Sequence, residues 1–389
     1  MDDFNPFNDL RASKNISETE INQPVSYRKY LAVIIILMLI AGISGFYYLN
    51  RQTKQIVNPK SSIINRVLPS PSPTLTPIPS SKTLSNGGYH VFQSFNNCGP
   101  AALSMALRFY GINVSQSELG QALRPYQVPF GDNDDKSVTL EEVAEKSKEY
   151  GFTPYLRPMG NDEIIKQFIA QDIPVITRTW LKKDDDIGHY RIIKGYDDTR
   201  GIFIQDDSLQ GKDLEYTYAD YDDIWKKFNY EYLVLIPKDK KEIAKRIIGE
   251  DINEKVAWEK AKDNSLKDLE SNPNDVDAGF NLSVAYYKLR EYEKSVEEFE
   301  KIESRLSFRT LWYQIDPILS YYELGNDEKV LQITERILNN QNRAFSELYI
   351  LRGKIYQRQG NKELARQEFQ KAVMYNSNLK EAQDLLSGV

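Results

Sequence analysis

The sequence predicts a multidomain chain with a single transmembrane helix, then an α+β domain, then an all-α solenoid of stacked helix pairs. Three observations lead to this prediction. An uncharged apolar stretch runs from Leu31 to Leu49, a helical segment followed by β-branched and aromatic runs fills residues 89–237, and residue types recur 35 positions apart after residue 281. With 389 residues, the chain is long enough for more than one hydrophobic core.

The composition is that of a globular protein, with 41% hydrophobic and 27% charged residues. The net charge is -6 and no long basic run occurs, which argues against nucleic acid as a partner. Cys98 is the only cysteine, so no intrachain disulfide can form. The sequence contains no metal-ligand spacing, phosphate-binding glycine loop or dinucleotide fingerprint. We therefore expect no cofactor and no metal.

The N-terminal part is predicted to hold the chain at a membrane. Residues 1–29 are polar and aperiodic, typical of a disordered tail. Residues 30–50 have the length and apolarity of a transmembrane signal anchor, with tyrosines near both ends, although a buried core helix is the alternative. Residues 51–88 include a Pro/Ser/Thr-rich stretch, 69–88, that indicates an extended stalk. A proline-rich ligand for another domain is the competing interpretation of that stretch.

The orientation of this anchor is not decided by charge, because Lys and Arg residues stand on both sides of it. Cleavage within Ala41–Gly45 stays open, since these residues are small. We favour an uncleaved anchor with its N-terminus inside. This interpretation makes the protein a single-pass membrane protein whose C-terminal domains are extracytoplasmic.

Residues 89–237 are predicted to form an α+β domain. A helix begins at Cys98, and residues 113–124 and 139–150 form two more, the latter capped by Thr139. Runs of β-branched and aromatic residues then predict an antiparallel sheet. The predicted strands are residues 152–157, 173–180, 189–196, 201–206 and 230–236.

Cys98 is the first candidate for a reactive group. It stands at the start of a helix that is apolar nearly all round, where free backbone amides and the helix dipole favour thiolate over thiol. Gln93 lies five residues earlier and can serve with the Cys98 amide as an oxyanion hole. A lone cysteine is also commonly a small core residue, so this role depends on partners elsewhere in the chain.

His189 is the candidate base. If residues 197–200 form a hairpin loop, Arg191 faces Asp206, and Asp206 then shares a sheet face with His189. Asp206 can thus orient the imidazole, and Asp207 is the alternative orienting residue. The other histidine, His90, has no comparable partner and is interpreted as structural.

An acidic run, residues 184–186, precedes His189. Its simplest interpretation is a solvated loop. Because it lies where a site rim would be, it can also select basic substrates.

These segments resemble the papain-like cysteine peptidases that remove double-glycine leaders from secreted peptides, especially their stand-alone members. The resemblance rests on QSFNNCGP from Gln93, on GHYRIIKGYDD at 188–198, and on IFIQD ending at Asp206. It implies a papain-like fold and bacterial origin, with Cys98 as nucleophile, His189 as base, Asp206 as orienting residue and Gln93 in the oxyanion hole. Proline usually follows the aspartate in that family, whereas Asp207 stands here, and no exporter is fused to this domain.

Residues 238–389 are predicted to form a solenoid. Tyr286, Tyr321 and Tyr356 are each 35 residues apart, and two segments, 281–302 and 352–373, closely resemble tetratricopeptide repeats. The middle copy contains Pro317, which predicts a bend or a late start of its first helix. Residues 253–271 form an extra helix that caps the stack. The array either supports the first domain or a dimer, or offers a concave surface to a protein partner.

The leading functional hypothesis is a membrane-anchored cysteine peptidase that hydrolyses peptide or protein substrates, with a repeat domain that recruits substrate or partner. A thiol-dependent acyl or amide transferase is the second, because an amine can intercept an acyl-enzyme. A catalytically inactive docking protein with the same fold is the third.

Overall fold

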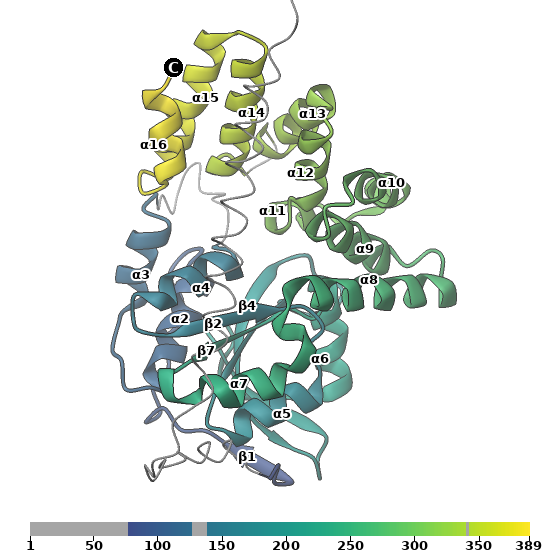
Figure 1. The fold of residues 1–389 in the computed structure, drawn as a ribbon. Coiled ribbons are helices and arrows are strands. Elements are labelled where there is room, and N and C mark those ends of the chain that lie inside the picture. The colour runs from purple at the N-terminus through teal and green to yellow at the C-terminus, as the bar shows by residue number, and fades with distance from the viewer. Residues whose placement is uncertain (1–76, 127–137, 340–341) are drawn as a thin grey trace, which may run out of the picture. The chain divides into compact units, whose positions relative to one another are not determined.

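The computed structural model describes residues 77–126, 138–339 and 342–389 (Figure 1), which all belong to one compact unit. The predicted tail, the predicted anchor and the stalk up to residue 76 lie outside the described residues. Within the part that is described, no helix has the length and apolarity needed to cross a membrane.

Three helices form the first layer of the N-terminal domain. They are α2 (Cys98–Arg108), α3 (Gln116–Leu123) and α4 (Leu140–Lys148). Thr139 caps α4 as predicted: its hydroxyl accepts the Glu142 amide, while the Glu142 carboxylate accepts the Thr139 amide. Residues 98–107 of α2 are buried, so this helix is the centre of its layer.

The sheet is antiparallel throughout, with strand order β2-β7-β3-β4-β5-β6 and β1 added beside β4. The strands are β1 (Ser81–Thr83), β2 (Thr153–Arg157), β3 (Val175–Trp180), β4 (Gly188–Asp197), β5 (Ile202–Asp207), β6 (Gly211–Thr217) and β7 (Tyr232–Ile236). Successive residues such as Val175 and Ile176 belong to two different hydrophobic cores, one on each face.

In the described residues, three helices that were not predicted from the sequence cover the second face of the sheet. They are α5 (Asp162–Ala170), α6 (Tyr218–Trp225) and α7 (Lys241–Ile248). Their apolar side chains pack with those of the sheet around Phe168 and Trp225. Short 3₁₀ helices lie at Lys226–Phe228, Lys238–Lys240 and Gly249–Ile252, and the last of them leads into the repeat helices.

The end of the predicted stalk is part of the folded domain. Ser81–Thr83 pairs with Gly195–Asp197 of β4, and Leu84 is buried in the core. The close approach requires glycine at 195, because a Cβ there would lie 2.8 Å from the Lys82 carbonyl oxygen. The expectation that residues up to 88 are extended and unpacked is therefore wrong for 81–84.

The pairing of β4 with β5 differs from the predicted register. Asp197 pairs with Ile202, and an irregularity between Ile193 and Gly195 then shifts the register by one residue. Arg191 consequently faces Asp207 rather than Asp206. Because successive strand residues point to opposite faces, this shift moves Asp207 to the His189 side.

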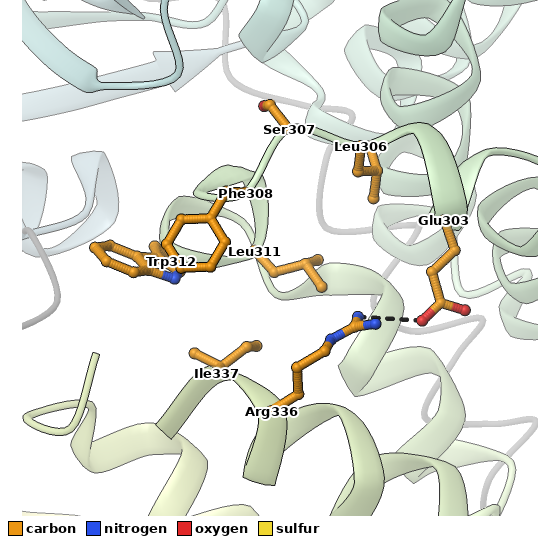
Figure 2. A pocket seen from close by; sticks show the side chains of 8 residues that line it. All are labelled: Glu303, Leu306, Ser307, Phe308, Leu311, Trp312, Arg336 and Ile337. Carbon is orange, nitrogen blue, oxygen red and sulfur yellow. Dashed lines mark hydrogen bonds and ion pairs between the residues drawn. The ribbon is translucent and has the colours of Figure 1, made fainter. Parts of the chain in front are cut away.

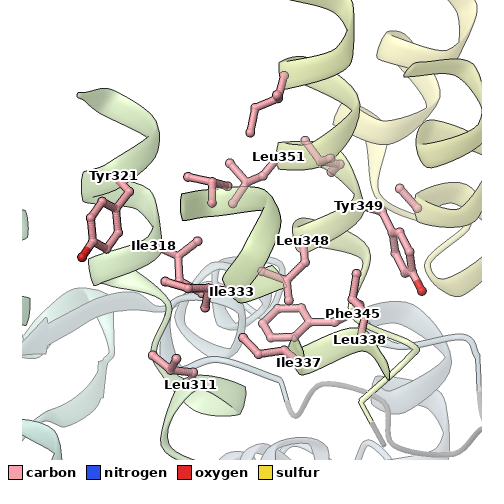
Figure 3. Packing of buried hydrophobic residues seen from close by; sticks show 14 of the residues in the cluster. Leu311, Ile318, Tyr321, Ile333, Ile337, Leu338, Phe345, Leu348, Tyr349 and Leu351 are labelled. Carbon is pink, nitrogen blue, oxygen red and sulfur yellow. The ribbon is translucent and has the colours of Figure 1, made fainter. Parts of the chain in front are cut away.

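The C-terminal half is all helical, as predicted. Its helices are α8 (Glu254–Ser271), α9 (Val276–Lys288), α10 (Tyr292–Ile302), α11 (Thr310–Tyr313), α12 (Asp316–Glu323), α13 (Asp327–Asn339), α14 (Ser346–Arg358), α15 (Lys362–Tyr375) and α16 (Lys380–Ser387). A 3₁₀ turn, Glu303–Arg305, follows α10. Figure 3 shows the core between these helices, where Ile318 and Ile333 point toward Leu348 and Phe345.

The 35-residue repeat has a structural counterpart at the helix ends. Arg290, Gly325 and Gly360 all have positive φ, at 63°, 72° and 78°. This left-handed residue follows the first helix of each pair and reverses the chain. The middle copy departs as expected: Pro317 lies in the first turn of α12, which starts late, after the separate short helix α11.

Candidate active site

Cys98 begins α2, and the next residue of this helix packs against Tyr190 near the start of β4. The Cys98 side chain is 4% exposed and belongs to the core that α2, α3 and α4 form with the sheet. The next residue, Gly99, packs so closely that a Cβ would lie 3.1 Å from Val138 Cβ and 3.4 Å from the Tyr190 ring. The thiol is thus held in place by packing.

Burial raises the pKa of the Cys98 thiol to about 11, because a thiolate there would lose its hydration. The backbone amide of Gly99 lowers that pKa and the Asp207 carboxylate raises it further. The expectation that the helix N-terminus favours thiolate is therefore wrong for this conformation. The amide has the predicted sign, but desolvation outweighs it.

The raised pKa predicts the pH dependence of alkylation. In the folded full-length chain, the rate of Cys98 modification by iodoacetamide should rise about tenfold per pH unit until about pH 11, because only thiolate reacts. In urea the rate should stop rising near pH 9.0, the ordinary pKa of a cysteine thiol. Mass spectrometry after timed quenching measures both profiles. A plateau below pH 9 in the folded chain would contradict the prediction.

His189 is the second residue of β4 and is 2% exposed. Its Nε2 donates a hydrogen bond of 2.8 Å to Asp207 Oδ1. The same carboxylate accepts the amides of Leu209 and Gln210. His189 Nδ1 therefore stays available for another partner, and no hydrogen bond joins it to Cys98 among the described residues.

Asp207 is held by a buried arginine, Arg191, whose role was not predicted from the sequence. Arg191 Nη1 donates to Asp207 Oδ2 at 2.6 Å, and its other nitrogens donate to Thr179 Oγ1 and the Leu181 carbonyl. Burial raises the pKa of Asp207, but the hydrogen bond from His189 and the charges of His189 and Arg191 lower it to about 2. Asp207 is thus ionised at neutral pH.

Asp206 lies on the opposite face and does not contact His189. Its Oδ1 accepts Lys194 Nζ at 2.5 Å and the Asp213 amide at 3.0 Å. The predicted pairing of Asp206 with His189 is therefore wrong, and the alternative residue, Asp207, takes that place. Regular alternation of side chains along β4 and β5 would place Asp206 on the His189 face. The irregularity at Lys194 reverses this, and the sequence does not reveal it.

Gln93 is hydrogen-bonded to Ser208, the residue after Asp207. The Gln93 side-chain Oε1 accepts the Ser208 hydroxyl at 2.8 Å, and the Gln93 backbone amide donates to the Ser208 carbonyl at 2.7 Å. This contact orients the carboxamide and leaves Nε2 to donate elsewhere. His90 also contributes, since its Nε2 donates to the Asp207 carbonyl oxygen at 2.9 Å. His90 thus has a structural role beside the candidate site.

A tyrosine from the repeat helices reaches the candidate site, which the sequence did not indicate. The Tyr313 ring packs on Gly188, where a Cβ would lie 2.9 Å from its carbons. The Tyr313 carbonyl accepts Arg178, and its ring contacts Trp180 with centroids 5.7 Å apart. Burial, with a smaller contribution from the nearby Cys98, raises the pKa of Tyr313 to about 12.

The acidic run before His189 is partly engaged by the repeat helices. Asp186 Oδ1 accepts Arg309 Nη1 at 2.7 Å, and Asp186 Oδ2 accepts the Arg309 amide at 3.2 Å. Asp186 is therefore not a free acidic group at the rim. Together with Tyr313, this ion pair places residues 309–313 against the start of β4.

Residues 84–233 match the peptidase C39-like family, and residues 346–379 match the tetratricopeptide repeat. None of the curated proteins matched the chain.

Solved structures similar to this chain include both kinds of protein. A putative C39-like peptidase from Bacillus anthracis is 13% identical (TM-score 0.34) and is covered over 98% of its length by 40% of this chain. The peptidase domain of Streptococcus ComA, a bifunctional ABC transporter in a quorum-sensing pathway, is 20% identical (TM-score 0.31). It is covered over 97% of its length by 38% of this chain. A tetratricopeptide repeat protein from Parabacteroides merdae is 23% identical (TM-score 0.29). It is covered over 54% of its length by 37% of this chain.

Proposed function

Because the chain joins a C39-like peptidase domain to tetratricopeptide repeats, we propose that it is a cysteine peptidase that hydrolyses peptide bonds through Cys98, His189 and Asp207. The observation that supports this most is the buried hydrogen bond between His189 Nε2 and Asp207 Oδ1. A carboxylate on Nε2 leaves Nδ1 unprotonated and able to accept the thiol proton.

The proposed mechanism follows from these roles. His189 Nδ1 takes the Cys98 proton as the sulfur attacks the substrate carbonyl, and the Cys98 amide with Gln93 Nε2 stabilises the oxyanion. The protonated His189 then gives its proton to the leaving amine, and a thioester remains on Cys98. Water activated by His189 hydrolyses this thioester and restores the thiol.

The raised pKa of Cys98 bears on the first step. Because burial keeps the Cys98 thiol protonated at neutral pH, its proton moves to His189 as the sulfur attacks. Asp207, ionised and fixed by Arg191, stabilises the imidazolium that forms.

To test this proposal, the purified full-length protein is incubated with a peptide library in mild detergent, and the masses of the products are measured by mass spectrometry. We expect cleavage by the native chain and none above background by Cys98→Ala or His189→Ala. A parallel reaction with added amines separates hydrolysis from transfer, because transfer products retain the amine mass. Equal cleavage by the native chain and Cys98→Ala would refute the proposal, and amine-bearing products alone would favour the transferase.

The membrane anchor is part of the proposal and rests on residues 30–50 of the sequence. An apolar stretch of that length spans a bilayer, and the Pro/Ser-rich segment after it spaces the folded unit from the surface. On this proposal, the peptidase and repeat domains are extracytoplasmic.

The repeat domain is proposed to bind a protein partner at a hollow of 240 Å³ near α11 and α13 (Figure 2). The side chains of Phe308, Leu311 and Ile337 give it apolar walls, and Phe308 is 56% exposed. The ion pair between Arg336 and Glu303 borders it. Such a hollow suits an apolar side chain flanked by charged groups.

A further inference from the structure

A cavity of 210 Å³ lies where the repeat helices pack against the N-terminal domain. Thr139 and Arg178 line it from one side, and Tyr287 and Tyr313 from the other. Five charged side chains contribute to its walls, three of them acidic: Glu141, Glu231, Asp316, Arg178 and Lys288. Acidic groups thus outnumber basic ones in the walls of this cavity.

One carboxylate oxygen of Glu231, Oε2, lacks a hydrogen-bond partner in this cavity. The residue is 3% exposed, and its Oε2 makes no hydrogen bond within the described part of the chain. Arg178 Nη1 lies 3.9 Å away, beyond hydrogen-bonding distance, and donates from its other nitrogen to the Tyr313 carbonyl. A buried carboxylate oxygen without a donor is costly, so an occupant that supplies one would bind favourably.

The second cation in the cavity is already engaged. Lys288 Nζ lies 3.3 Å from Glu141 and 3.4 Å from Asp316. Neither basic side chain is therefore left to attract an anion. The group left without a hydrogen bond is Glu231 Oε2, which would accept from a positively charged donor.

Two residues of the cavity wall, Arg178 and Tyr313, lie near the candidate nucleophile. Arg178 lines the cavity, and its charge lowers the pKa of Cys98. Tyr313 also lines it and packs on Gly188, the residue before His189. Glu141, whose side chain is 51% exposed, places an acidic group at the accessible part of the cavity wall. Arg178 and Tyr313 thus connect the cavity wall to Cys98 and to the start of β4.

We propose that this cavity binds the ammonium or guanidinium group of a lysine or arginine in the peptide substrate, with Glu231 Oε2 as its principal acceptor. This proposal rests on the proposed peptidase function and adds the class of substrate. A metal ion is a poorer occupant, because the described residues contain no group of three or more His, Cys, Asp or Glu side chains able to hold one. Residues 184–186, which the sequence suggested for this selection, contribute no side chain to the cavity.

The ionisation of Glu231 agrees with this assignment. Burial raises the pKa of Glu231, Glu141 on α4 raises it further, and Arg178 on β3 and Lys288 on α9 only partly offset this; Asp316 on α12 also raises it. A bound cation would favour the ionised carboxylate, so cation binding should release a proton. Affinity for the cation should therefore increase with pH.

The first arm of the test measures binding without catalysis. The full-length Cys98→Ala protein is titrated calorimetrically with N-acetyl-arginine amide and with its uncharged analogue, N-acetyl-citrulline amide. We expect the arginine compound to bind roughly 10- to 100-fold more tightly, since a charge-assisted hydrogen bond is lost with citrulline. Adding Glu231→Gln should abolish the difference, whereas adding Glu368→Gln, a buried carboxylate in α15 paired with Arg352, should preserve it.

The second arm compares kcat/KM for matched peptides with arginine or citrulline near the scissile bond. Preference for arginine that Glu231→Gln removes supports the proposal. Arginine-selective binding without cleavage of any peptide supports the cavity while refuting the peptidase function. Cleavage without such preference, or equal binding of the two amides, overturns the cavity proposal while leaving the peptidase function intact. If Glu231→Gln does not fold, Asp316→Asn provides the second variant.

Discussion

Replacing Asp207 with asparagine should lower kcat/KM by roughly 10³- to 10⁴-fold while leaving the protein folded. An asparagine has one side-chain oxygen, so it cannot accept both from Arg191 and from His189 Nε2, as the two Asp207 oxygens do. When Arg191 keeps that oxygen, Nδ2 faces His189 Nε2, the imidazole places its proton on Nδ1, and that nitrogen can no longer take the thiol proton. The loss should appear in kcat rather than in KM, because the substrate does not contact Asp207 in the proposed mechanism.

The matched control is Asp206→Asn. Asp206 is the neighbouring residue and is equally buried, but its carboxylate accepts Lys194 and the Asp213 amide on the other side of the sheet. This variant should lose stability and keep kcat/KM within a few-fold when measured well below its unfolding temperature. Equal losses of kcat in the two variants would contradict the assignment of Asp207, and a larger loss in Asp206→Asn would reinstate the original prediction.

Replacing Arg191 with leucine should destabilise the protein by about 3 to 5 kcal/mol, the usual cost of leaving one partner of a buried ion pair behind. Arg191 is fully buried, donates to Asp207, Thr179 and the Leu181 carbonyl, and lies over the Tyr216 ring. Its removal strands the Asp207 carboxylate in the sheet. Thermal unfolding should show a midpoint lower by roughly 10 °C.

Arg200→Leu is the control for this variant. Arg200 stands in the turn that follows the same strand and pairs with Glu215, but its side chain is 50% exposed. Solvent screens that pair, so its loss should hardly move the midpoint. If the two midpoints fell equally, the buried network around Asp207 would contribute nothing special to stability.

The repeat region could be read from sequence because helix pairs interact with their neighbours along the chain. The 35-residue spacing of Arg290, Gly325 and Gly360 reflects one local requirement, a left-handed residue after each first helix. Pro317 likewise acts locally and delays α12. Resemblance to C39-like peptidases and to tetratricopeptide repeats was likewise evident from short motifs, and the matches at 84–233 and 346–379 confirm it.

The candidate site could be read only in part. Gln93, Cys98 and His189 were selected because their types and order fit nucleophile chemistry, and the structure places them around one strand and one helix end. Their roles stay predictions. The orienting carboxylate depended on strand register, and a single irregularity at Lys194 exchanged the faces of Asp206 and Asp207. No local pattern in the sequence marks that shift.

The sequence by itself thus determined the C39-like region followed by tetratricopeptide repeats, the single thiol and the residues around it, because these follow from local propensity, periodicity and motif. Only the tertiary structure decided three further features: which aspartate holds His189, how far burial raises the pKa of Cys98, and that Tyr313 of the repeat helices lies near the thiol. The physical reason is the same in each case. Register, desolvation and the contact between the repeat helices and the sheet arise from groups far apart in the chain.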